Sequence, residues 1–278
     1  MKDNKFIMLV SGTGGVGKNT LINGILNNDN IEFISSYTTR QKRETDKKNQ
    51  YNFITKEEFE AKIKSGEIFE YDIFNNQYYG TSKLMFSEGL KNNDVVVKDM
   101  SILGCRNLKE AMGQDYRIVT VFLTESKKVL KQRLIDRGEK PERIKNRLAL
   151  YKKEQAAMIN YNYAIKNTIY NLSIEKLEAL MRVETNSDII YPCKDYSKIT
   201  AKKIDKFALK LEHGKTLKPI KVALIDKKIF IVDGVHRYLA SLKTGKNVCK
   251  QFVEYTGEKF DFNLDEWKKI IKAYDINS

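Results

Sequence analysis

The sequence predicts an α/β protein, with a parallel sheet covered by helices on both faces, followed by a small α+β domain. Three apolar runs carry the first part of this prediction: FIMLV near the start, then VVVKDM and VTVFLT. Short apolar runs that alternate with helical periodicity are typical of parallel strands joined by helices. Beyond about residue 187 the pattern resets, which predicts domains at residues 1–187 and 188–278.

Composition narrows the class of protein. The chain has 278 residues, of which 41% are hydrophobic, enough for two cores of ordinary size. FIMLV is too short for a secretory signal or a membrane span, and no later window approaches a span in length. Cys105, Cys193 and Cys249 have neither metal nor disulfide spacing. We therefore expect a reduced, cytoplasmic enzyme with no membrane partner.

The net charge of +14 suggests an anionic ligand but is not concentrated in one segment. Residues 188–278 contain 19 Lys and Arg against 12 Asp and Glu, and the rest contains 31 against 24, so each part carries +7. Without a basic tail, most of these lysines are expected on solvated helix faces. This distribution of charge does not favour DNA as a partner.

The segment after FIMLV is GTGGVGK, Gly12 to Lys18, which fits the phosphate-binding pattern GxxxxGK. In this pattern the glycines let backbone N–H groups curl around a phosphate, and the lysine neutralises its outer oxygens. The following helix adds the positive end of its dipole. The sequence therefore predicts a nucleotide phosphate site made by Gly12, Thr13, Gly14, Gly15, Val16, Gly17, Lys18, Asn19 and Thr20.

The residue after the lysine departs from the usual pattern. Asn19 stands where Ser or Thr commonly ligates Mg²⁺, and the hydroxyl moves to Thr20. An amide oxygen still accepts a hydrogen bond from a metal-bound water. We expect Asn19 and Thr20 to hold Mg²⁺ mostly through water, with weaker affinity than a standard site.

Three segments after the first helix, SSYTTRQKR, QYNF and EIFEYDIFNNQYYGTSK, combine arginines, hydroxyls, tyrosines and a carboxylate. Arg40 and Arg43 are three apart, a spacing that suits two guanidinium forks on one phosphate. Such a set suits a nucleotide acceptor. Its predicted phosphate donors are Ser36, Tyr51 and Tyr79, and its predicted readers of a base edge are Glu70 and Thr81.

The order of these motifs resembles the guanylate kinase family from about residue 4 to 184. The shared elements are the GxxxxGK loop, S-x-T-T-R-x-x-R, Y-x-F, E-x-x-E-[YW] and Y-Y-G-[ST]. The resemblance implies a P-loop nucleoside monophosphate kinase fold that uses ATP and Mg²⁺ and phosphorylates GMP or dGMP. It assigns the GMP phosphate to Ser36, Arg40, Arg43, Tyr51 and Tyr79, and guanine to Glu70 and Thr81.

Physical chemistry supports the assignment of guanine. A carboxylate accepts hydrogen bonds from the N1–H and amino groups of guanine, whereas adenine lacks that pair of donors. A site with a buried, unpaired Glu70 is expected to reject adenine by about 10⁴-fold.

VVVKDM reads as a buried strand that ends at Asp99 and is close to the family pattern L-D-I-D. Val97 replaces the first aspartate of that pattern. Asp99 is expected near the acceptor nucleotide or near the ligands that surround the metal.

After VTVFLT, arginines recur near helical spacing in RLIDRGEKPERIKNRL. R-L-x-x-R-G followed by R-L resembles the mobile lid of the same family, which selects Arg133, Arg137 and Arg147 and leaves Arg143 less well matched. Such arginines would neutralise charge on the moving phosphoryl group. Asn167, in AIKNT, matches the family position near the adenine of ATP. The catalytic set by this reading is Lys18, Arg40, Asp99, Arg133, Arg137 and Arg147.

In residues 188–278, Thr200 is a predicted helix cap and Gly214 a predicted stop, with two strands following around Asp226-Lys227-Lys228. The predicted apolar face of that helix comprises Ile204, Phe207, Ala208 and Leu211. His213 is interpreted as a helix-end residue.

The strand IFIV leads into Asp233-Gly234-Val235-His236-Arg237 at the start of a further helix. Backbone N–H groups, an imidazole and a guanidinium suit a phosphate there. The order PI-x-V, D-G-x-H-R, A, G resembles the ParB/sulfiredoxin superfamily over about residues 188–255. This implies a second nucleotide, ATP or CTP, at Asp233, Gly234, His236 and Arg237.

Departures from the superfamily narrow the choice. Val235 replaces the cysteine that sulfiredoxin activity needs, and the partition clamps carry arginine at the position of His236. The form D-G-x-H-R is more similar to the nucleotide-using kinase branch, with Asp233 a candidate base or metal partner.

Two other functions stay open at this point. The first domain could be a non-catalytic scaffold, but scaffold relatives of guanylate kinase typically lose the P-loop that this chain keeps. Alternatively, the protein serves a phage-type nucleotide or DNA modification pathway, in which the second domain binds DNA or a nucleotide or acts as a second kinase.

Overall fold

The structure is a computed structural model that describes residues 4–42, 44, 51–74, 76–193, 197–257 and 261–276. It divides into two compact units. The first comprises residues up to Ser11 and Ile22–Val119, and the second comprises Gly12–Leu21 and Thr120–Ser278. The phosphate-binding loop therefore belongs to the second unit, together with the predicted lid.

The first unit contains a parallel arrangement of three strands in the order β1-β7-β2. Phe6 through Val10 of β1 are fully buried, as expected for a parallel strand covered on both faces. This finding confirms the strands predicted at FIMLV and VVVKDM. The bounds are β1 (Phe6–Gly12), α1 (Lys18–Ile25), β2 (Ile31–Phe33), α3 (Lys83–Asn92), β7 (Val95–Asp99) and α4 (Ile102–Met112).

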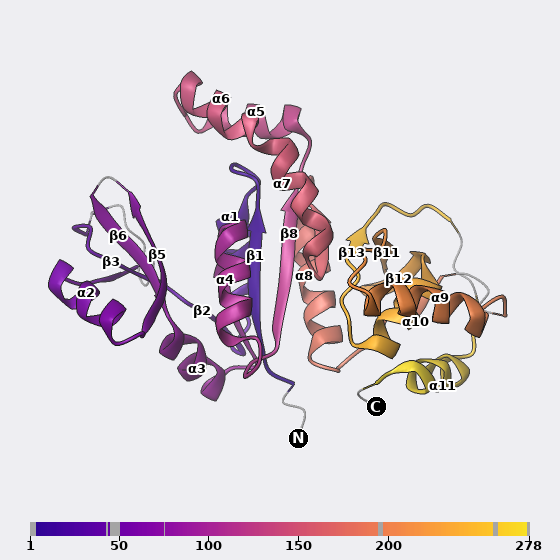
Figure 1. The fold of residues 1–278 in the computed structure, drawn as a ribbon. Coiled ribbons are helices and arrows are strands. Elements are labelled where there is room, and N and C mark those ends of the chain that lie inside the picture. Colours follow the sequence, from indigo (N-terminus) through magenta and orange to yellow (C-terminus); the bar gives the residue numbers. More distant parts are fainter. Residues whose placement is uncertain are drawn as a thin grey trace. The chain divides into compact units, whose positions relative to one another are not determined.

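A second sheet in this unit has the order β4-β3-β6-β5 and carries the predicted acceptor motifs (Figure 1). Helix α2 begins with a capping box, in which Thr55 accepts from the Glu58 N–H and the Glu58 side chain accepts from the Thr55 N–H. Its Phe59 is fully buried. The bounds are β3 (Ser36–Thr38), β4 (Tyr51–Phe53), α2 (Lys56–Lys64), β5 (Ile68–Phe74) and β6 (Gln77–Ser82).

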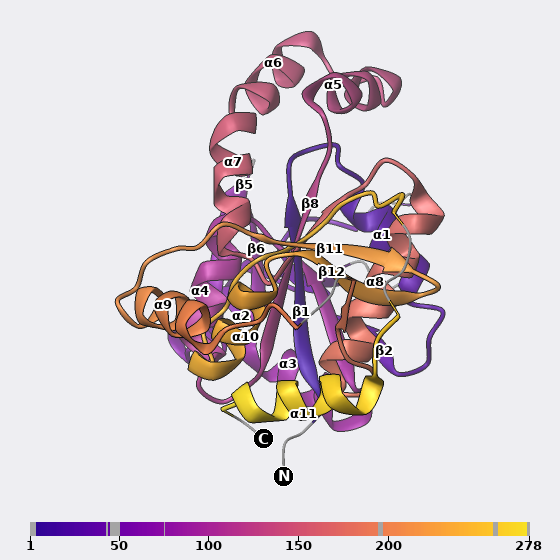
Figure 2. The same ribbon diagram turned by 90° about the vertical axis from the view of Figure 1, so that its right-hand side faces the viewer.

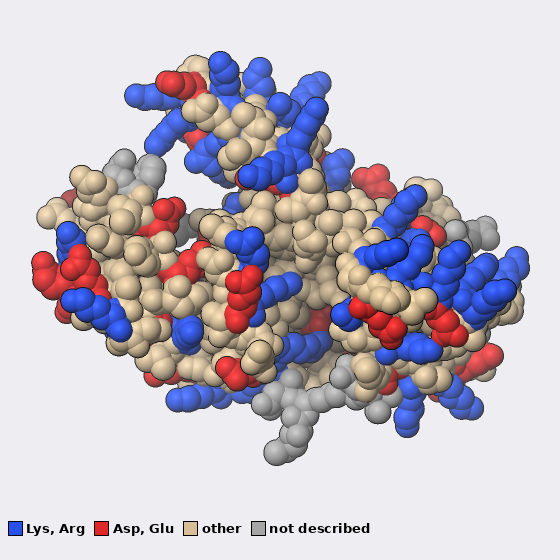
Figure 3. Space-filling model, viewed as in Figure 1, with Lys and Arg blue, Asp and Glu red and all other residues tan. Residues whose placement is uncertain are grey.

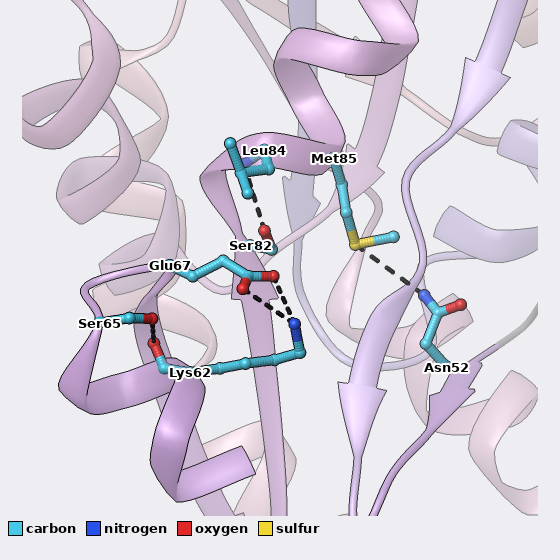
Figure 4. Close-up of polar contacts among 7 residues, drawn as sticks. All are labelled: Asn52, Lys62, Ser65, Glu67, Ser82, Leu84 and Met85. Carbon is cyan, nitrogen blue, oxygen red and sulfur yellow. Dashed lines mark hydrogen bonds and ion pairs between the residues drawn. The ribbon is translucent and has the colours of Figure 1, made fainter. Parts of the chain in front are cut away.

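Side-chain contacts brace this second sheet at its edges (Figure 4). Lys62 of α2 donates to both carboxylate oxygens of Glu67 at 2.8 Å, just before β5 begins. Ser82, the last residue of β6, caps α3 by accepting from the Leu84 N–H at 3.1 Å. The acceptor strands are thus fixed to helices on either side, which limits their freedom to slip in register.

The second unit has the strand order β10-β12-β11-β13-β9-β8. Only the β11–β12 pair is antiparallel among the pairs within this unit that the structure describes. The bounds are β8 (Ile118–Thr124), α5 (Lys127–Asp136), α6 (Pro141–Ala149), α7 (Tyr151–Ala157), a 3₁₀ turn (Met158–Asn160), β9 (Tyr163–Lys166), α8 (Tyr170–Glu184), β10 (Tyr191–Pro192), α9 (Ala201–Glu212), β11 (Ile220–Ile225), β12 (Lys228–Asp233), α10 (Val235–Thr244), β13 (Lys250–Phe252) and α11 (Leu264–Tyr274).

The C-terminal strands continue the sheet that contains β8 and β9. β13 pairs in parallel with β9, with Lys250 opposite Tyr163, and the Lys250 N–H donates to the Asn162 carbonyl at 2.9 Å. The sequence analysis treated residues 188–278 as a separate unit, whereas backbone hydrogen bonds join them to β9. The boundary near residue 187 stays a prediction, and the sheet does not end there.

The helix and the two strands predicted in the C-terminal region are present as α9 and the β11–β12 hairpin (Figure 2). Helix α9 follows Thr200, buries Ile204 and Leu211, and ends before Gly214 at a φ of +70°. Phe207 is half-buried on the same helix. Asp226 and Lys227 both have positive φ, which is the conformation of a two-residue hairpin turn between β11 and β12.

One detail of that helix differs from the prediction. Thr200 occupies the N-cap position, but its side chain makes no capping hydrogen bond. Its backbone N–H instead donates to His236 Nε2 at 3.3 Å, which joins the start of α9 to α10. No helix in the described ranges is long and apolar enough to cross a membrane.

Candidate functional site

The phosphate-binding loop follows a path that requires glycine. Gly12, Gly15 and Gly17 have φ values of 146°, 86° and 94°. A Cβ on Gly12 would overlap the Leu123 carbonyl oxygen, and one on Gly17 would lie 2.9 Å from Asn167 Nδ2. Only glycine tolerates both the conformation and the crowding at these positions, as expected for a loop whose backbone curls around a phosphate.

Lys18 begins α1 directly after the loop. Its Nζ donates to the Gly12 carbonyl at 2.9 Å, so the ammonium folds back over the loop it follows. Thr13 is almost fully buried, and Gln155 Nε2 approaches its hydroxyl at 3.4 Å. The helix dipole and the ammonium both favour an anion at this loop.

Two predicted residues brace the loop through one carbonyl. Asn167 Nδ2 donates to the Val16 carbonyl at 2.7 Å, and Arg133 Nη1 donates to the same oxygen at 3.3 Å. Arg133 Nη2 also donates to the Asn167 carbonyl at 2.8 Å. Residues separated by more than a hundred positions thus hold one loop carbonyl, which fixes the loop in place before any ligand binds.

The other predicted lid arginines are placed differently. The Arg147 guanidinium lies against the loop, since a Cβ on Gly14 would be 2.6 Å from Arg147 Nη1, and its Nε pairs with Glu139 at 3.0 Å. Arg137 is exposed at the end of α5, and Arg143 is exposed on α6. Lys and Arg crowd the surface of α5 and α6 (Figure 3).

Glu154 on α7 is a loop neighbour that the sequence analysis missed. One of its carboxylate oxygens is buried with no hydrogen-bond partner in the described part of the chain. Burial raises the pKa of Glu154, while the charges of Lys18 and Arg147 oppose that rise. No motif marks this glutamate, because its proximity to Lys18 depends on how α7 folds back.

The residues predicted to hold Mg²⁺ offer suitable donors. Asn19 and Thr20 are exposed on the first turn of α1 and present an amide oxygen and a hydroxyl. Oxygen donors of this kind suit Mg²⁺, which keeps several waters when it binds proteins. The residues described here contain no cluster of three or more His, Cys, Asp or Glu side chains that could hold a metal.

In the first unit, the predicted phosphate donors of the acceptor site lie on neighbouring strands. Ser36 is paired with Tyr51 across β3 and β4, and Thr38 is paired with Tyr79 across β3 and β6. The rings of Tyr51 and Tyr79 pack edge to face at 5.8 Å. The structure therefore brings together three side chains that are distant in the sequence.

Arg40 lies over this cluster. Its Cζ is 5.4 Å from the ring centroid of Tyr51 and 5.5 Å from that of Phe53. Stacking on aromatic faces holds a guanidinium without consuming its N–H donors. Arg43, the second predicted fork, lies outside the described residues.

Glu70 and Thr81, the predicted readers of guanine, are direct partners across β5 and β6. Thr81 is only 4% exposed, and Glu70 Oε2 is buried with no hydrogen-bond partner within the described ranges. Burial raises the pKa of Glu70, the charge of Lys98 lowers it, and Asp72 raises it further. An unpaired buried carboxylate oxygen is costly unless a ligand donor completes it.

Strand β7 brings two more charged residues to this unit. Asp99 ends the strand and is half-buried, and Val97, in place of the pattern's first aspartate, is fully buried. Lys98 between them was not singled out from the sequence, yet it is almost completely buried and contacts Ser36. The apolar run around it gave no signal of that contact.

The D-G-x-H-R segment lines a cavity of about 310 Å³ in the C-terminal region. Gly234 has a φ of +100°, and the Arg237 guanidinium packs against it. Arg237 Nη2 pairs with Asp233 at 3.1 Å and donates to the Pro219 carbonyl at 3.2 Å. Asp233, Gly234, His236 and Arg237 therefore lie together, with part of their hydrogen-bonding capacity used among themselves.

His236 contributes to this cavity as a neutral ring. Its pKa is lowered by burial and by the charges of Lys203 and Arg237, while a hydrogen bond with the backbone of Lys198 raises it. Its Nε2 already accepts from the Thr200 N–H.

Comparison with known proteins gives one family match. The model of the family described as "Guanylate kinase" matches residues 4–184. The guanylate kinase of Clostridium tetani is 34% identical over 180 residues, which are 64% of this chain and 86% of that protein. The guanylate kinase of Clostridium perfringens is 35% identical over 188 residues, 66% of this chain and 86% of that protein.

Among solved structures, the guanylate kinase of Anaplasma phagocytophilum aligns with 66% of this chain and 88% of its own, at a TM-score of 0.49 and 22% identity. The family match ends at residue 184 and so leaves residues 185–278 without an identified family.

Proposed function

We propose, from the premise that the chain belongs to the guanylate kinase family, that it transfers the γ-phosphate of ATP to GMP or dGMP. It is a guanylate kinase, a nucleoside monophosphate kinase. The choice of a guanine nucleotide as acceptor rests on Glu70. Its buried Oε2 has no hydrogen-bond partner within the described ranges, and Glu70 is the cross-strand partner of Thr81. Guanine N1–H and N2–H supply the donors that this carboxylate lacks.

On the donor side, the loop amides and Lys18 bind the phosphates of ATP. The Val16 carbonyl accepts from Asn167 and Arg133, which restrains the loop backbone at that residue. Phosphoryl transfer requires positioning and charge stabilisation rather than covalent chemistry from the protein. Arg147, which lies against Gly14, and Arg137 neutralise the moving phosphoryl group.

On the acceptor side, Arg40 and Arg43 bind the GMP phosphate, with Ser36, Tyr51 and Tyr79 as further donors. The stacking on Tyr51 holds the Arg40 guanidinium beside the predicted phosphate donors, and its Nη1 donates to the Gln41 carbonyl at 2.8 Å. Asp99 stands at the acceptor nucleotide. Asn19 and Thr20 would hold Mg²⁺, which supplies charge neutralisation of the ATP phosphates when bound.

The test is ADP release measured with Mg-ATP and a panel of GMP, dGMP, AMP, CMP, UMP and dTMP. We expect turnover with GMP or dGMP alone and its loss in Arg40→Ala, with Arg106→Ala as a matched control because Arg106 is exposed on α4 and pairs with Glu110. Turnover with AMP equal to that with GMP would contradict the role of Glu70. Silence across the panel would favour the non-catalytic scaffold.

The C-terminal region is a second candidate site. We propose that residues 188–278 form a ParB/sulfiredoxin-like domain that binds a nucleotide, ATP or CTP, at the cavity beside Asp233 and Arg237. The observation that favours it is the cavity itself, which opens at the start of α10 and is lined by Gly234, His236 and Arg237. The start of a helix and a guanidinium suit a phosphate.

Titration calorimetry with ATP and CTP tests this second site in the Lys18→Met variant, which weakens the first. We expect Arg237→Met to lose binding and Lys243→Met, an exposed change on the same helix, to keep it. Equal binding in both variants would remove the proposal. A mobility-shift titration with duplex DNA across salt tests the modification pathway, because phosphate contacts impose a steep salt dependence.

A further inference from the structure

Lys98 is a buried cation in the first unit, and the proposed mechanism has given it no role. It lies on β7, and only 3% of its surface is exposed. Lysine is almost never buried to this extent unless its charge is paired, because desolvation of an ammonium is costly. Its position corresponds to the isoleucine of the L-D-I-D pattern, so the pattern does not account for a charge here.

The contacts of Lys98 point to the predicted acceptor site. Nζ donates to the Ile34 carbonyl at 2.9 Å and to Ser36 Oγ at 2.9 Å. The carboxylates that act on its charge are Asp99, its neighbour on β7, and Glu70 on β5. The ammonium therefore contacts a predicted phosphate ligand and interacts with the predicted guanine reader.

The bond to Ser36 fixes the direction in which that hydroxyl donates. A serine hydroxyl has one hydrogen and two acceptor positions. Because Nζ occupies an acceptor position of Ser36 Oγ, the hydroxyl hydrogen points elsewhere and is available to a phosphate oxygen. Lysine has no acceptor, so this orientation cannot reverse.

The charge of Lys98 also acts on Glu70. Burial lowers the pKa of Lys98 to about 8, with Asp99 and Glu70 opposing the change, so the ammonium is mostly charged at pH 7. In return, Lys98 lowers the pKa of Glu70 against the effect of burial. A charged Glu70 is the form that accepts both donors of guanine.

We infer that Lys98 is a positioning residue for the acceptor nucleotide, which sets Ser36 as a donor to the GMP phosphate and supplies a positive charge that acts on the Glu70 carboxylate. This inference rests on the proposed transfer to GMP or dGMP. Lys98 acts through two other side chains and is assigned no contact with the reacting atoms.

The test compares steady-state kinetics of the full chain with those of Lys98→Met, which shortens the side chain by one atom and removes its charge. We expect KM for GMP to rise by about 10- to 100-fold, the range for one hydrogen bond to a charged group, with KM for ATP within about twofold. Lys64→Met is the matched control, because Lys64 is exposed on α2 and lies outside the predicted ligand set.

A double-mutant cycle with Ser36→Ala separates positioning from a general loss of structure. If Lys98 acts through Ser36, the double variant loses less than the sum of the two single losses in free energy. Equal rises in KM for GMP and ATP, an unchanged KM for GMP, or strict additivity would each overturn the inference. Should Lys98→Met not fold, Lys98→Gln replaces it: because Gln keeps a donor for Ser36, KM for GMP should rise less than in Ser36→Ala, and an equal rise would overturn the inference.

The outcomes also separate this inference from the proposed function. A wild-type enzyme that turns over GMP while Lys98→Met has unchanged KM values overturns the role of Lys98 alone. A wild-type enzyme without GMP or dGMP turnover removes the proposed function, and the role of Lys98 with it.

Discussion

The phosphate loop and the acceptor sheet differ in which of their polar groups have hydrogen-bond partners in the protein. In the loop, the carbonyls of Val16 and Gly12 already accept hydrogen bonds from Asn167, Arg133 and Lys18. In the acceptor sheet, Glu70 Oε2 is buried and unpaired within the described ranges. Protein donors thus hold these loop carbonyls, whereas no donor in the described ranges pairs with Glu70 Oε2, and the proposed selectivity for guanine rests on that oxygen.

The largest effect is expected from removing the charge at the loop. Lys18→Met should lower kcat by about 10²-fold or more, because a fixed positive group at the transferring phosphates is lost. Affinity for GMP alone should not change, since the acceptor residues belong to the other unit.

Steady-state assays at saturating ATP and GMP measure the first quantity, and calorimetric titration of the free protein with GMP measures the second. Lys128→Met, an exposed change on α5, is the control. A kcat within twofold of wild type would mean that the loop holds phosphate without its lysine.

The next effect tests selectivity at the acceptor sheet. Glu70→Gln should lower kcat/KM for GMP by up to about 10²-fold, because the amide removes one charged acceptor and turns an N–H donor toward guanine. The low kcat/KM for AMP should not fall together with that for GMP. Kinetics with both nucleotides, with Glu57→Gln on α2 as control, measure the ratio. If GMP and AMP decline together, Glu70 supports the fold and does not read the base.

The two regions also differ in how far the sequence predicts them. The loop and its flanking strand and helix follow from seven consecutive residues, because the glycine conformations and the lysine are local properties. Glu70 and Thr81 were both predicted to contact guanine, but their pairing across β5 and β6 was not predicted.

What the sequence did not predict depends on contacts between distant segments. Lys98 lies in an apolar run, and its partners Ile34 and Ser36 are 64 and 62 positions away. The pairing of β13 with β9 joins residues more than 80 positions apart, and strand pairing of that kind leaves no local pattern. The role of a charged residue on a strand can be inferred only when the residues packed around it are known.

A smaller effect probes the space around Glu70. Gly104 on α4 has no side chain, and a Cβ there would lie 2.5 Å from Glu70 Oε1. Gly104→Ala should raise KM for GMP by about 10-fold, since a displacement near 1 Å can cost that much or more. Alanine favours a helix over glycine, so thermal stability should hold or rise.

The pair of measurements, KM and melting temperature, makes this variant informative. A lower melting temperature together with a higher KM would show that the helix, and not the carboxylate, moved. Gly113→Ala is the wrong control, because its Cβ would meet the Lys109 carbonyl. Ser87→Ala, at a half-buried position on α3, serves instead.

The smallest effect concerns stability and pH in the unliganded protein. Burial raises the folded-state pKa of Glu70 above its ordinary value, so its contribution favours folding at low pH and is lost as pH rises through that pKa. At pH 7 the charged carboxylate therefore opposes folding. Glu70→Gln should raise the melting temperature by a few degrees at pH 7 and by less at pH 4.5, measured by thermal denaturation without nucleotide.

Added GMP should stabilise wild type more than the variant, because only the carboxylate gains its missing donors from guanine. An equal shift of the melting temperature in both proteins would show that Glu70 is paired before the nucleotide binds.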